Sequence, residues 1–349
     1  TRAAIRRLRR ERPGAELVVT GCAAEIDPAG FASMPEVDRV VGNLDKLRPD
    51  QWGATALPAP RFDDHARAFV EVQNGCDHRC TFCAIPFGRG PSRSTPAGAV
   101  VERIKALVDA GHREVVLTGV DVTSYGHDLP GSPTLGALVE RILRFAPGLE
   151  RLRLSSLDSV EIDDRLFELI TGEPRIMPHL HLSLQAGSDL ILKRMKRRHS
   201  RGQAVAVVER LKARRSDIAI GADLIAGFPT EDAAMFADTL ALVDDCDIVH
   251  AHIFPYSARA GTPAARMPQV PHERRRERAA RLRERAAARK RAWLASMVGQ
   301  ERAVLVERSG DRGHSPEFAD VRLPPSRPGS IRRVRVTAAT DTHLEGVPL

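Results

Sequence analysis

The 349-residue chain is 42% hydrophobic and 28% charged, a composition typical of ordinary globular proteins, and it has room for two or three domains. No stretch approaches eighteen uninterrupted apolar residues, so we expect no membrane-spanning segment and no membrane partner. The net charge of +8 favours a polyanionic partner such as nucleic acid, although the arginine- and alanine-rich composition of a GC-rich genome would give the same charge. Five cysteines are too few for a disulfide scaffold, and their clustering indicates a reducing, cytoplasmic compartment and a bound metal.

Residues 1–50 predict part of an α/β domain. A basic helix is followed by a strand at 15–21, a short helix and a second strand at 37–42. The sequence begins at Thr1, inside the helical pattern, so we expect the beginning of this domain to lie upstream. Residues 51–67 carry prolines and little periodicity, which predicts a linker.

Residues 68–270 alternate between short apolar runs and helical stretches. The apolar runs lie at 68–73, 114–119, 152–156, 180–185, 218–227 and 247–256, and helices are expected at 97–111, 135–146 and 231–245. Strands that alternate with helices form a parallel sheet, because a parallel connection needs a crossover. Right-handed crossovers curl such a sheet, so the predicted fold is α/β with a partial (β/α)6 barrel.

Polar or small residues follow each predicted strand of this barrel. Because catalytic groups of such barrels lie at the carboxyl ends of the strands, these positions predict one shared site. They are the cysteine-rich segment 74–90, then Thr118–Asp121, Ser155–Ser156, Gln185, Gly227 and Tyr256.

The region after the barrel is strongly basic and then turns to short strands. Residues 271–297 predict a helix, in which ten basic side chains between Arg274 and Arg291 face two acidic ones. Pairs such as Glu277 with Arg281 would make it a solvated helix, but the surplus charge favours a surface that faces phosphates. Residues 298–349 alternate apolar and polar residues between glycines and prolines, which predicts a small antiparallel β-barrel that grips RNA.

The segment "NGCDHRCTFCAIPFGRG" places Cys76, Cys80 and Cys83 in a C-x₃-C-x₂-C spacing. Three thiolates can hold three irons of a [4Fe–4S] cubane and leave the fourth iron open to a small molecule. A zinc site completed by His78 and a thioredoxin-like pair of Cys80 and Cys83 are the alternatives. The zinc site lacks a well-placed fourth ligand, and the redox pair leaves Cys76 unexplained.

The cysteine spacing, with Phe82 in the aromatic slot, resembles the signature of radical S-adenosylmethionine enzymes. The ordered segments 75–94, 114–126, 152–162, 180–189, 221–231 and 252–264 together resemble the methylthiotransferases of that superfamily. The "LTGVDVTSYG" segment is most similar to enzymes that modify N6-threonylcarbamoyladenosine in tRNA. The last 50 residues resemble the small β-barrel called a TRAM domain.

This resemblance implies roles for particular residues. Cys76, Cys80 and Cys83 would ligate the [4Fe–4S] cluster that binds S-adenosylmethionine, and Phe82 would lie by the adenine of that cofactor. The other residues expected to line the cofactor pocket are Gly119, Ser156 and Gln185. Cys22 would be one ligand of a second [4Fe–4S] cluster, whose other two ligands would lie upstream of Thr1, so only the first cluster is securely held by the sequence as given. No catalytic side chain is assigned.

The implied reaction adds a methylthio group to C-2 of N6-threonylcarbamoyladenosine at position 37 of tRNA, next to the anticodon. Its partners would be tRNA, S-adenosylmethionine and an electron donor such as flavodoxin or ferredoxin. One alternative is a methylthiotransferase that acts on isopentenyladenosine of tRNA or on an aspartate of a ribosomal protein. An alternative of another class is an RNA-binding protein with a structural or regulatory cluster.

Overall fold

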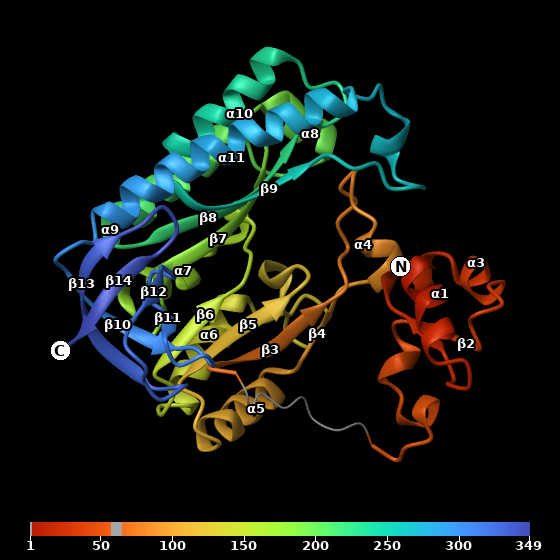
Figure 1. Ribbon diagram of the computed structural model, residues 1–349, viewed down its shortest axis with the longest axis horizontal. Helices are drawn as coiled ribbons and strands as arrows, with labels where there is room; N and C mark the ends of the chain where they lie inside the picture. The colour runs from red at the N-terminus through yellow and green to blue at the C-terminus, as the bar shows by residue number, and fades with distance from the viewer. Residues whose placement is uncertain (1, 57–64) are drawn as a thin grey trace. The chain divides into compact units, whose positions relative to one another are not determined.

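The structure is a computed structural model that describes residues 2–56 and 65–349, and within them the chain packs as two units. The first unit comprises residues 2–56, 75–79 and 83–92, and the second comprises 65–74, 80–82 and 93–349. Figure 1 shows the elements of both. Every helix across the described ranges is too short or too polar to cross a lipid bilayer.

The first unit is a small α/β structure. Its elements are α1 (Arg2–Glu11), β1 (Val18–Thr20), α2 (Cys22–Ile26), α3 (Pro28–Ala32), β2 (Arg39–Val41), two 3-10 turns (Asp45–Leu47 and Pro49–Trp52) and α4 (Ile85–Arg89). Strands β1 and β2 pair in parallel, as the two predicted strands require. Their core is formed by Ile5, Ala24, Phe31 and Met34.

The predicted linker at 51–67 lies partly outside the described residues, since positions 57–64 are not described. At its edges the structure differs from a simple linker. Gln51 and Trp52 belong to the second 3-10 turn, and Arg67 already begins a strand.

The second unit contains six parallel strands separated by helices. The strands are β3 (Arg67–Asn74), β5 (Glu114–Gly119), β6 (Arg151–Leu154), β7 (His179–Gln185), β8 (Ala219–Ala226) and β9 (Ile248–Pro255). The helices are α5 (Ala97–Asp109), α6 (Leu135–Phe145), α7 (Asp164–Gly172), α8 (Asp189–Met195), α9 (Arg201–Arg214), α10 (Ala233–Asp245) and α11 (His272–Ala295). All six strands start or end within a few residues of the predicted positions.

These strands form two sheets, in the orders β4-β3-β5-β6 and β7-β8-β9, where β4 (Arg93–Ser94) is a short antiparallel edge. Two parallel bridges, Leu152 with Ile176 and Leu157 with Leu182, connect the sheets. One large core lies between strands and helices, and side chains such as Ile104, Leu117 and Leu152 are fully buried in it. Burial of apolar surface of this extent is what holds the strand ends in place.

A closed five-stranded barrel ends the chain. It consists of β10 (Glu301–Val306), β11 (Arg312–His314), β12 (Asp320–Arg322), β13 (Ile331–Ala339) and β14 (Leu344–Pro348), paired in the order β10-β11-β12-β14-β13. One pair, β12 with β14, is parallel, and the others are antiparallel. A mixed α/β structure with a small closed barrel is therefore confirmed.

Phe318 of the barrel packs against the amino ends of the parallel strands. Its φ of +71° is unusual for a residue with a side chain, and its ring stacks on His314 (centroids 4.4 Å apart) and on His179 of β7 (5.0 Å). The guanidinium carbons of Arg67 and Arg153 lie 5.1 and 4.9 Å from the ring centroid. Cations over an aromatic face attract its quadrupole, so Phe318 joins the barrel to β3, β6 and β7.

A buried carboxylate supports the same junction. Glu114, at the start of β5, is fully buried and lies 2.8 Å from Arg153 Nε and 3.2 Å from Arg67 Nε. Burial raises the pKa of Glu114, but the neighbouring arginines outweigh burial and hold the pKa below its usual range. Arg67 also contacts Glu307 of the barrel, and Arg153 Nη2 donates to Ser315 O (3.0 Å).

Candidate functional site

The cysteine loop leaves β3 through Gly75, whose φ is +75°. A Cβ on Gly75 would overlap the carbonyl oxygen of Pro91, so both the conformation and the space require glycine. The next residue, Cys76, donates its backbone N–H to Gly90 O at 3.1 Å. The two ends of the loop are therefore tied together beside the first cysteine.

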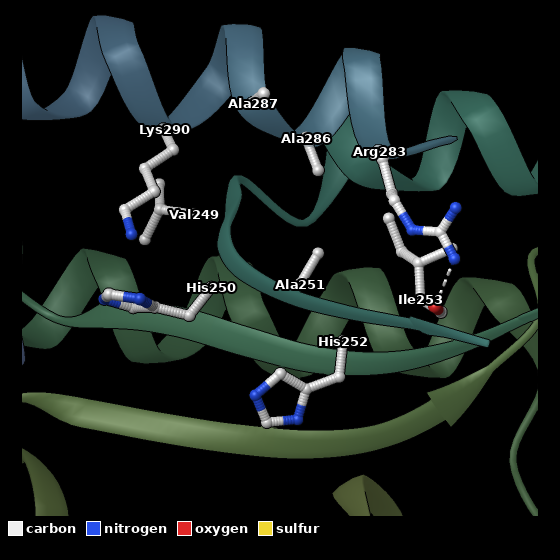
Figure 2. Close-up of a pocket in the computed structure, with 9 residues that line it drawn as sticks. All are labelled: Val249, His250, Ala251, His252, Ile253, Arg283, Ala286, Ala287 and Lys290. Carbon is white, nitrogen blue, oxygen red and sulfur yellow. Dashed lines mark hydrogen bonds between the residues drawn. The ribbon is translucent and has the colours of Figure 1, made fainter. Parts of the chain in front are cut away.

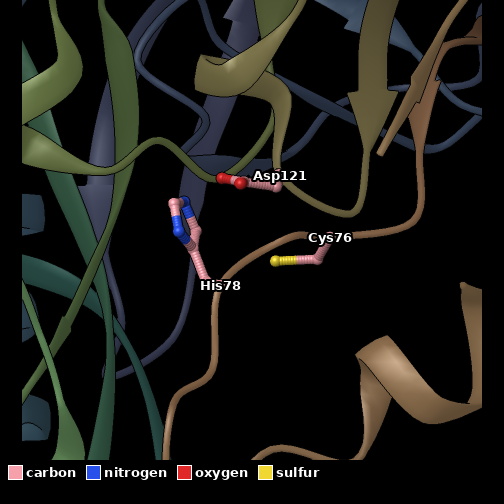
Figure 3. Close-up of side chains that lie close together, drawn as sticks. All are labelled: Cys76, His78 and Asp121. Atoms are coloured by element: carbon pink, nitrogen blue, oxygen red, sulfur yellow. The ribbon is translucent and has the colours of Figure 1, made fainter. Parts of the chain in front are cut away.

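All three cysteines of the loop are unoxidised and partly exposed. Figure 3 shows the Cys76 thiol and the His78 imidazole on the loop backbone. Cys83 Sγ accepts the backbone N–H of Ile85 at 3.4 Å, at the start of α4. A hydrogen bond to sulfur favours a negatively charged ligand atom.

Thr81, between the second and third cysteines, is anchored to the end of α8. Its backbone N–H donates to Met195 O (3.1 Å), and its hydroxyl donates to Arg194 O (2.8 Å). Its carbonyl accepts the N–H of Ala264 at 2.9 Å. Three hydrogen bonds of a buried residue fix the position of the neighbouring Cys80.

Arg197 connects Cys80 to two other strand ends. Its Nη1 lies 3.8 Å from Cys80 Sγ, while its Nη2 contacts Asp158 Oδ2 (2.7 Å) and Ser183 O (2.9 Å). A guanidinium this close stabilises negative charge on the sulfur. No pattern in the sequence distinguishes Arg197 from the other basic residues of the run "KRMKRRHS".

Phe82 packs into a satellite hydrophobic cluster. Its ring meets Phe228 edge to face, with centroids 6.4 Å apart, and Phe228 in turn meets Tyr256 at 5.5 Å. Phe228 is fully buried, whereas Phe82 is only partly buried. Phe82 therefore keeps part of its surface accessible at the edge of this cluster.

Gly119 ends β5 against the end of β3. A Cβ there would lie 2.8 Å from Gln73 O, so this close approach excludes larger side chains. The Gln73 amide oxygen accepts the backbone N–H groups of Val120 (3.1 Å) and Asp121 (2.8 Å). Asp121, which is also drawn in Figure 3, follows β5 directly. Sequence reasoning missed the buried Gln73, although a glutamine inside an apolar strand is the kind of signal that marks such a position.

The remaining two predicted pocket residues also lie at strand ends. Ser156 follows β6 and is exposed, and the buried hydroxyl of its neighbour Ser155 has no hydrogen-bond partner among the described residues. Gln185 ends β7 with a φ of +67°. A side-chain-bearing residue in this region is strained, and such strain concentrates at functional sites.

Three polar side chains meet on neighbouring strands inside the second unit. Asp223 Oδ1 of β8 lies 3.0 Å from His181 Nε2 of β7 and 3.2 Å from His252 Nδ1 of β9. Burial raises the pKa of Asp223, but hydrogen bonds and charge from the two histidines keep it below its usual range. Two histidines from the neighbouring strands therefore provide the hydrogen-bond partners of the Asp223 carboxylate.

Cys22 occupies the first position of α2 in the first unit. Asn43 Nδ2 lies 3.6 Å from its sulfur, and a Cβ on Gly88 of α4 would come within 2.7 Å of Cys22 Cβ. Cys22 is a free, partly exposed thiol, and it packs against α4. In contrast, Cys246 is fully buried, and burial raises the pKa of its thiol to about 12, which confirms it as a core residue.

The family model of the radical SAM superfamily matches residues 70–243. This match, together with the parallel strands and the cysteine loop, assigns the protein to the radical S-adenosylmethionine superfamily. A radical S-adenosylmethionine methyltransferase, TsrM from Kitasatospora setae, shares the fold with a TM-score of 0.56 at 16% identity, over 76% of this chain and 59% of its own.

Curated relatives assign the chain to one family within this superfamily. The threonylcarbamoyladenosine tRNA methylthiotransferase MtaB of Rickettsia prowazekii is 46% identical over 92% of this chain and 80% of its own length. The tRNA-2-methylthio-N(6)-dimethylallyladenosine synthase of Cereibacter sphaeroides is 37% identical over 98% of this chain and 84% of its own length. The chain belongs to the radical S-adenosylmethionine tRNA methylthiotransferase family.

The donor set of the loop fits the iron–sulfur cluster and S-adenosylmethionine that this family implies. Cys76, Cys80 and Cys83 offer three unoxidised, partly exposed sulfurs on one segment of eight residues. Thiolates are the usual ligands of such clusters, and three of them leave one iron for another molecule. The hydrogen bond to Cys83 and the guanidinium beside Cys80 both suit negatively charged sulfur.

Proposed function

We propose that this protein adds a methylthio group to C-2 of N6-threonylcarbamoyladenosine at position 37 of tRNA. The observation that carries the proposal is the 46% identity to an enzyme named for that reaction over 92% of the chain, with the cysteine loop inside the matched region.

In this proposal Cys76, Cys80 and Cys83 hold the cluster at the carboxyl ends of the strands. When bound, the cluster and S-adenosylmethionine supply the one-electron cleavage that yields a 5′-deoxyadenosyl radical. Phe82 offers a ring face to the adenine of the cofactor, and Arg197 lies beside the Cys80 sulfur. The hard chemistry belongs to the cofactor, and the side chains bind, orient and exclude water.

Gly119, Ser156 and Gln185 line the cofactor pocket in the same proposal. The tight contact of Gly119 with Gln73, the exposure of Ser156 and the strained backbone of Gln185 support places near a ligand. We assign no catalytic side chain, because the abstracting group is the cofactor radical rather than an acid or base of the chain.

The finer architecture is part of the proposal as well. Residues 68–270 would form a partial (β/α)6 radical barrel, residues 298–349 a TRAM-like barrel that grips RNA, and residues 1–50 part of a methylthiotransferase α/β domain. Residues 271–297 would add a phosphate-facing helix. A reduced flavodoxin or ferredoxin would donate the electron, and the need for reduced thiolates suits the cytoplasm.

Cys22 would be one ligand of the second cluster, which would supply the sulfur chemistry. Cys22 lies at the start of α2, in contact with α4 and the Asn43 amide. This position supports a role as a cluster ligand rather than as a buried hydrophobic residue.

The test is anaerobic reconstitution of the protein with iron and sulfide, followed by dithionite, S-adenosylmethionine and tRNA that carries N6-threonylcarbamoyladenosine. We expect 5′-deoxyadenosine and, by mass spectrometry of digested tRNA, the 2-methylthio nucleoside. Replacement of Cys80 by Ala should abolish both products. If the reduced protein leaves S-adenosylmethionine intact, the chain is instead an RNA-binding protein with a structural or regulatory cluster.

A second substrate is favoured by the 37% identical relative that is named for dimethylallyladenosine. The same assay with tRNA that carries isopentenyladenosine separates the two substrates. Methylthiolation of that tRNA alone would overturn the choice of threonylcarbamoyladenosine.

A further inference from the structure

The basic side chains of α11 divide according to the flank of the helix on which they lie. Half of the ten basic residues between Arg274 and Arg291 pair with carboxylates. They are Arg274 with Glu277, Arg278 with Glu231, Arg285 with Asp244, Arg289 with Asp247 and Arg291 with Asp341. These cations already have carboxylate partners within the protein, and four of the five partners lie outside α11.

A second group follows a different line along the same helix. Arg276, Arg283 and Lys290 are seven residues apart, which is close to two full turns, so they share one side of α11 at intervals of about 10 Å. No carboxylate within ion-pair distance of these three cations is found in the described residues. We call these three residues the cationic stripe.

Two residues of the cationic stripe, Arg283 and Lys290, border a pocket between α11 and β9 (Figure 2), with a volume of about 300 Å³. Arg283 and Lys290 reach over it from the helix, and His250 and His252 belong to the strand below. The rest of the lining is small or apolar: Val249, Ala251, Ile253, Ala286 and Ala287. The lining contains no acidic residue, so nothing in the pocket competes with an anion for the two cations.

The strand that forms the other wall is an edge strand. β9 pairs only with β8 in its sheet, and Arg283 Nη2 donates to one of its carbonyls, Ile253 O, at 3.3 Å. His250 Nε2 is buried and has no hydrogen-bond partner among the described residues. Burial and the charge of Lys290 lower the pKa of His250 to about 3, so its imidazole is neutral at neutral pH.

The cationic stripe also has a direction. α11 begins after the carboxyl end of β9 and packs back along β9 and β8, as Figure 1 shows. Its last turn carries Trp293 and Leu294, which pack on the hydrophobic core of the closed barrel. The stripe therefore runs from the carboxyl ends of the strands toward the barrel.

We propose that Arg276, Arg283 and Lys290 bind the phosphodiester backbone of RNA along the groove between α11 and the edge of β9. The inference rests on the proposed function, because that function identifies the RNA as tRNA. The tRNA backbone would then pass from the barrel to the carboxyl ends of the strands. It names the surface and the residues that supply the sequence-independent part of that binding.

The chemistry of the groove favours a phosphate backbone over a protein partner. Protein interfaces are depleted of lysine and depend on buried aromatic anchors, whereas this groove is lined by small aliphatic residues and two histidines, with arginine and lysine above them. Two acidic residues, Glu273 and Glu277, line a second pocket together with Arg276 at the beginning of the helix, so we expect Arg276 to contribute least of the three cations.

The experiment compares two triple variants of the cluster-loaded protein. R276Q/R283Q/K290Q removes the stripe, and R274Q/R285Q/R291Q removes the same charge from exposed arginines that already have carboxylate partners. The dissociation constant for tRNA is measured anaerobically by fluorescence anisotropy at several salt concentrations. Circular dichroism and thermal melting show whether both variants fold.

We expect the stripe variant to bind tRNA roughly tenfold to a hundredfold more weakly and to reduce the slope of log K against log salt by about 2 to 3. The control should keep the wild-type slope. Equal slopes for all three proteins, or equal losses in both variants, would overturn the proposal, as would an unchanged tRNA affinity with slower reduction by an acidic flavodoxin.

The measurement reads tRNA binding and not methylthiolation. Wild-type protein that binds tRNA without modifying it would contradict the proposed substrate while the two triple variants still report on the stripe.

Discussion

Gly75 is the residue on which the geometry of the cysteine loop depends most directly. It has a left-handed φ of +75°, and an added Cβ would overlap the backbone of Pro91. We expect Gly75→Ala to displace the loop beside Cys76 and to lower the iron bound after reconstitution by at least half. Iron and sulfide analysis with electron paramagnetic resonance measures the change.

Gly98 provides the control for this substitution. It lies in α5 with open space where a Cβ would be, so Gly98→Ala should leave the iron content unchanged and stabilise the helix by about 0.5–1 kcal/mol. Full iron content in the Gly75→Ala protein would show that the loop tolerates a shift in its first turn.

Among single residues, the candidate cluster ligands and pocket residues were easier to identify from the sequence than the side chains that hold them in place. The cysteine spacing and the strand-end position of Gln185 are local patterns, so they could be predicted. Arg197 and Asp223 could not, because their partners Cys80, Asp158, His181 and His252 are distant in sequence and adjacent only in the fold.

Among the elements, α11 depends on one buried ion pair. Arg278 Nη1 lies 2.7 Å from Glu231 Oε1, and both side chains are buried. Arg278→Met leaves the carboxylate buried and unpaired, so we expect it to lower the free energy of unfolding by about 3–5 kcal/mol. Urea denaturation followed by circular dichroism measures this.

Two further variants make the interpretation specific. The double variant E231Q/R278M removes both charges and should be clearly more stable than R278M alone. Arg274→Gln, which breaks an exposed pair on the same helix, should cost no more than about 1 kcal/mol. Equal losses for R278M and R274Q would argue against a buried pair.

The elements found from the sequence share strong periodicity. All six parallel strands and α11 have long apolar or charged patterns, and they match the structure closely. The short strands β11 and β14 were missed, since "RGH" and "LEGVP" have no alternation of their own and become strands only through barrel closure. The helix α9 was also missed, because its alanines and valines are spread around it rather than gathered on one face.

For the molecule as a whole, Phe318 couples the closed barrel to the parallel strands. Phe318→Ala removes the ring that stacks on His179 and His314 and lies under two arginines, and we expect it to destabilise the protein by roughly 2–4 kcal/mol. The barrel should then unfold in a separate, earlier transition. Trp293 fluorescence in a Trp52→Phe background follows that transition, since Trp293 packs on the barrel core.

Phe145→Ala is the matched control, because Phe145 is 48% exposed and its ring also lies beside two arginines, Arg141 and Arg144. It should leave a single transition near the wild-type midpoint. A single, unshifted transition in the Phe318→Ala protein would mean that the ion pairs around Glu114 suffice to hold the barrel.

The attachment of the barrel at Phe318 has a consequence for substrate choice. The barrel meets the amino ends of the strands, whereas Gly119 and Gln185 lie at the opposite ends, and eight residues of extended chain such as β3 span about 26 Å. If the barrel binds RNA, the fold sets a fixed distance between the bound RNA and the reactive ends of the strands. The nucleotide that reaches the reactive end is then selected by its distance from the gripped portion of the folded RNA, in addition to the identity of its base.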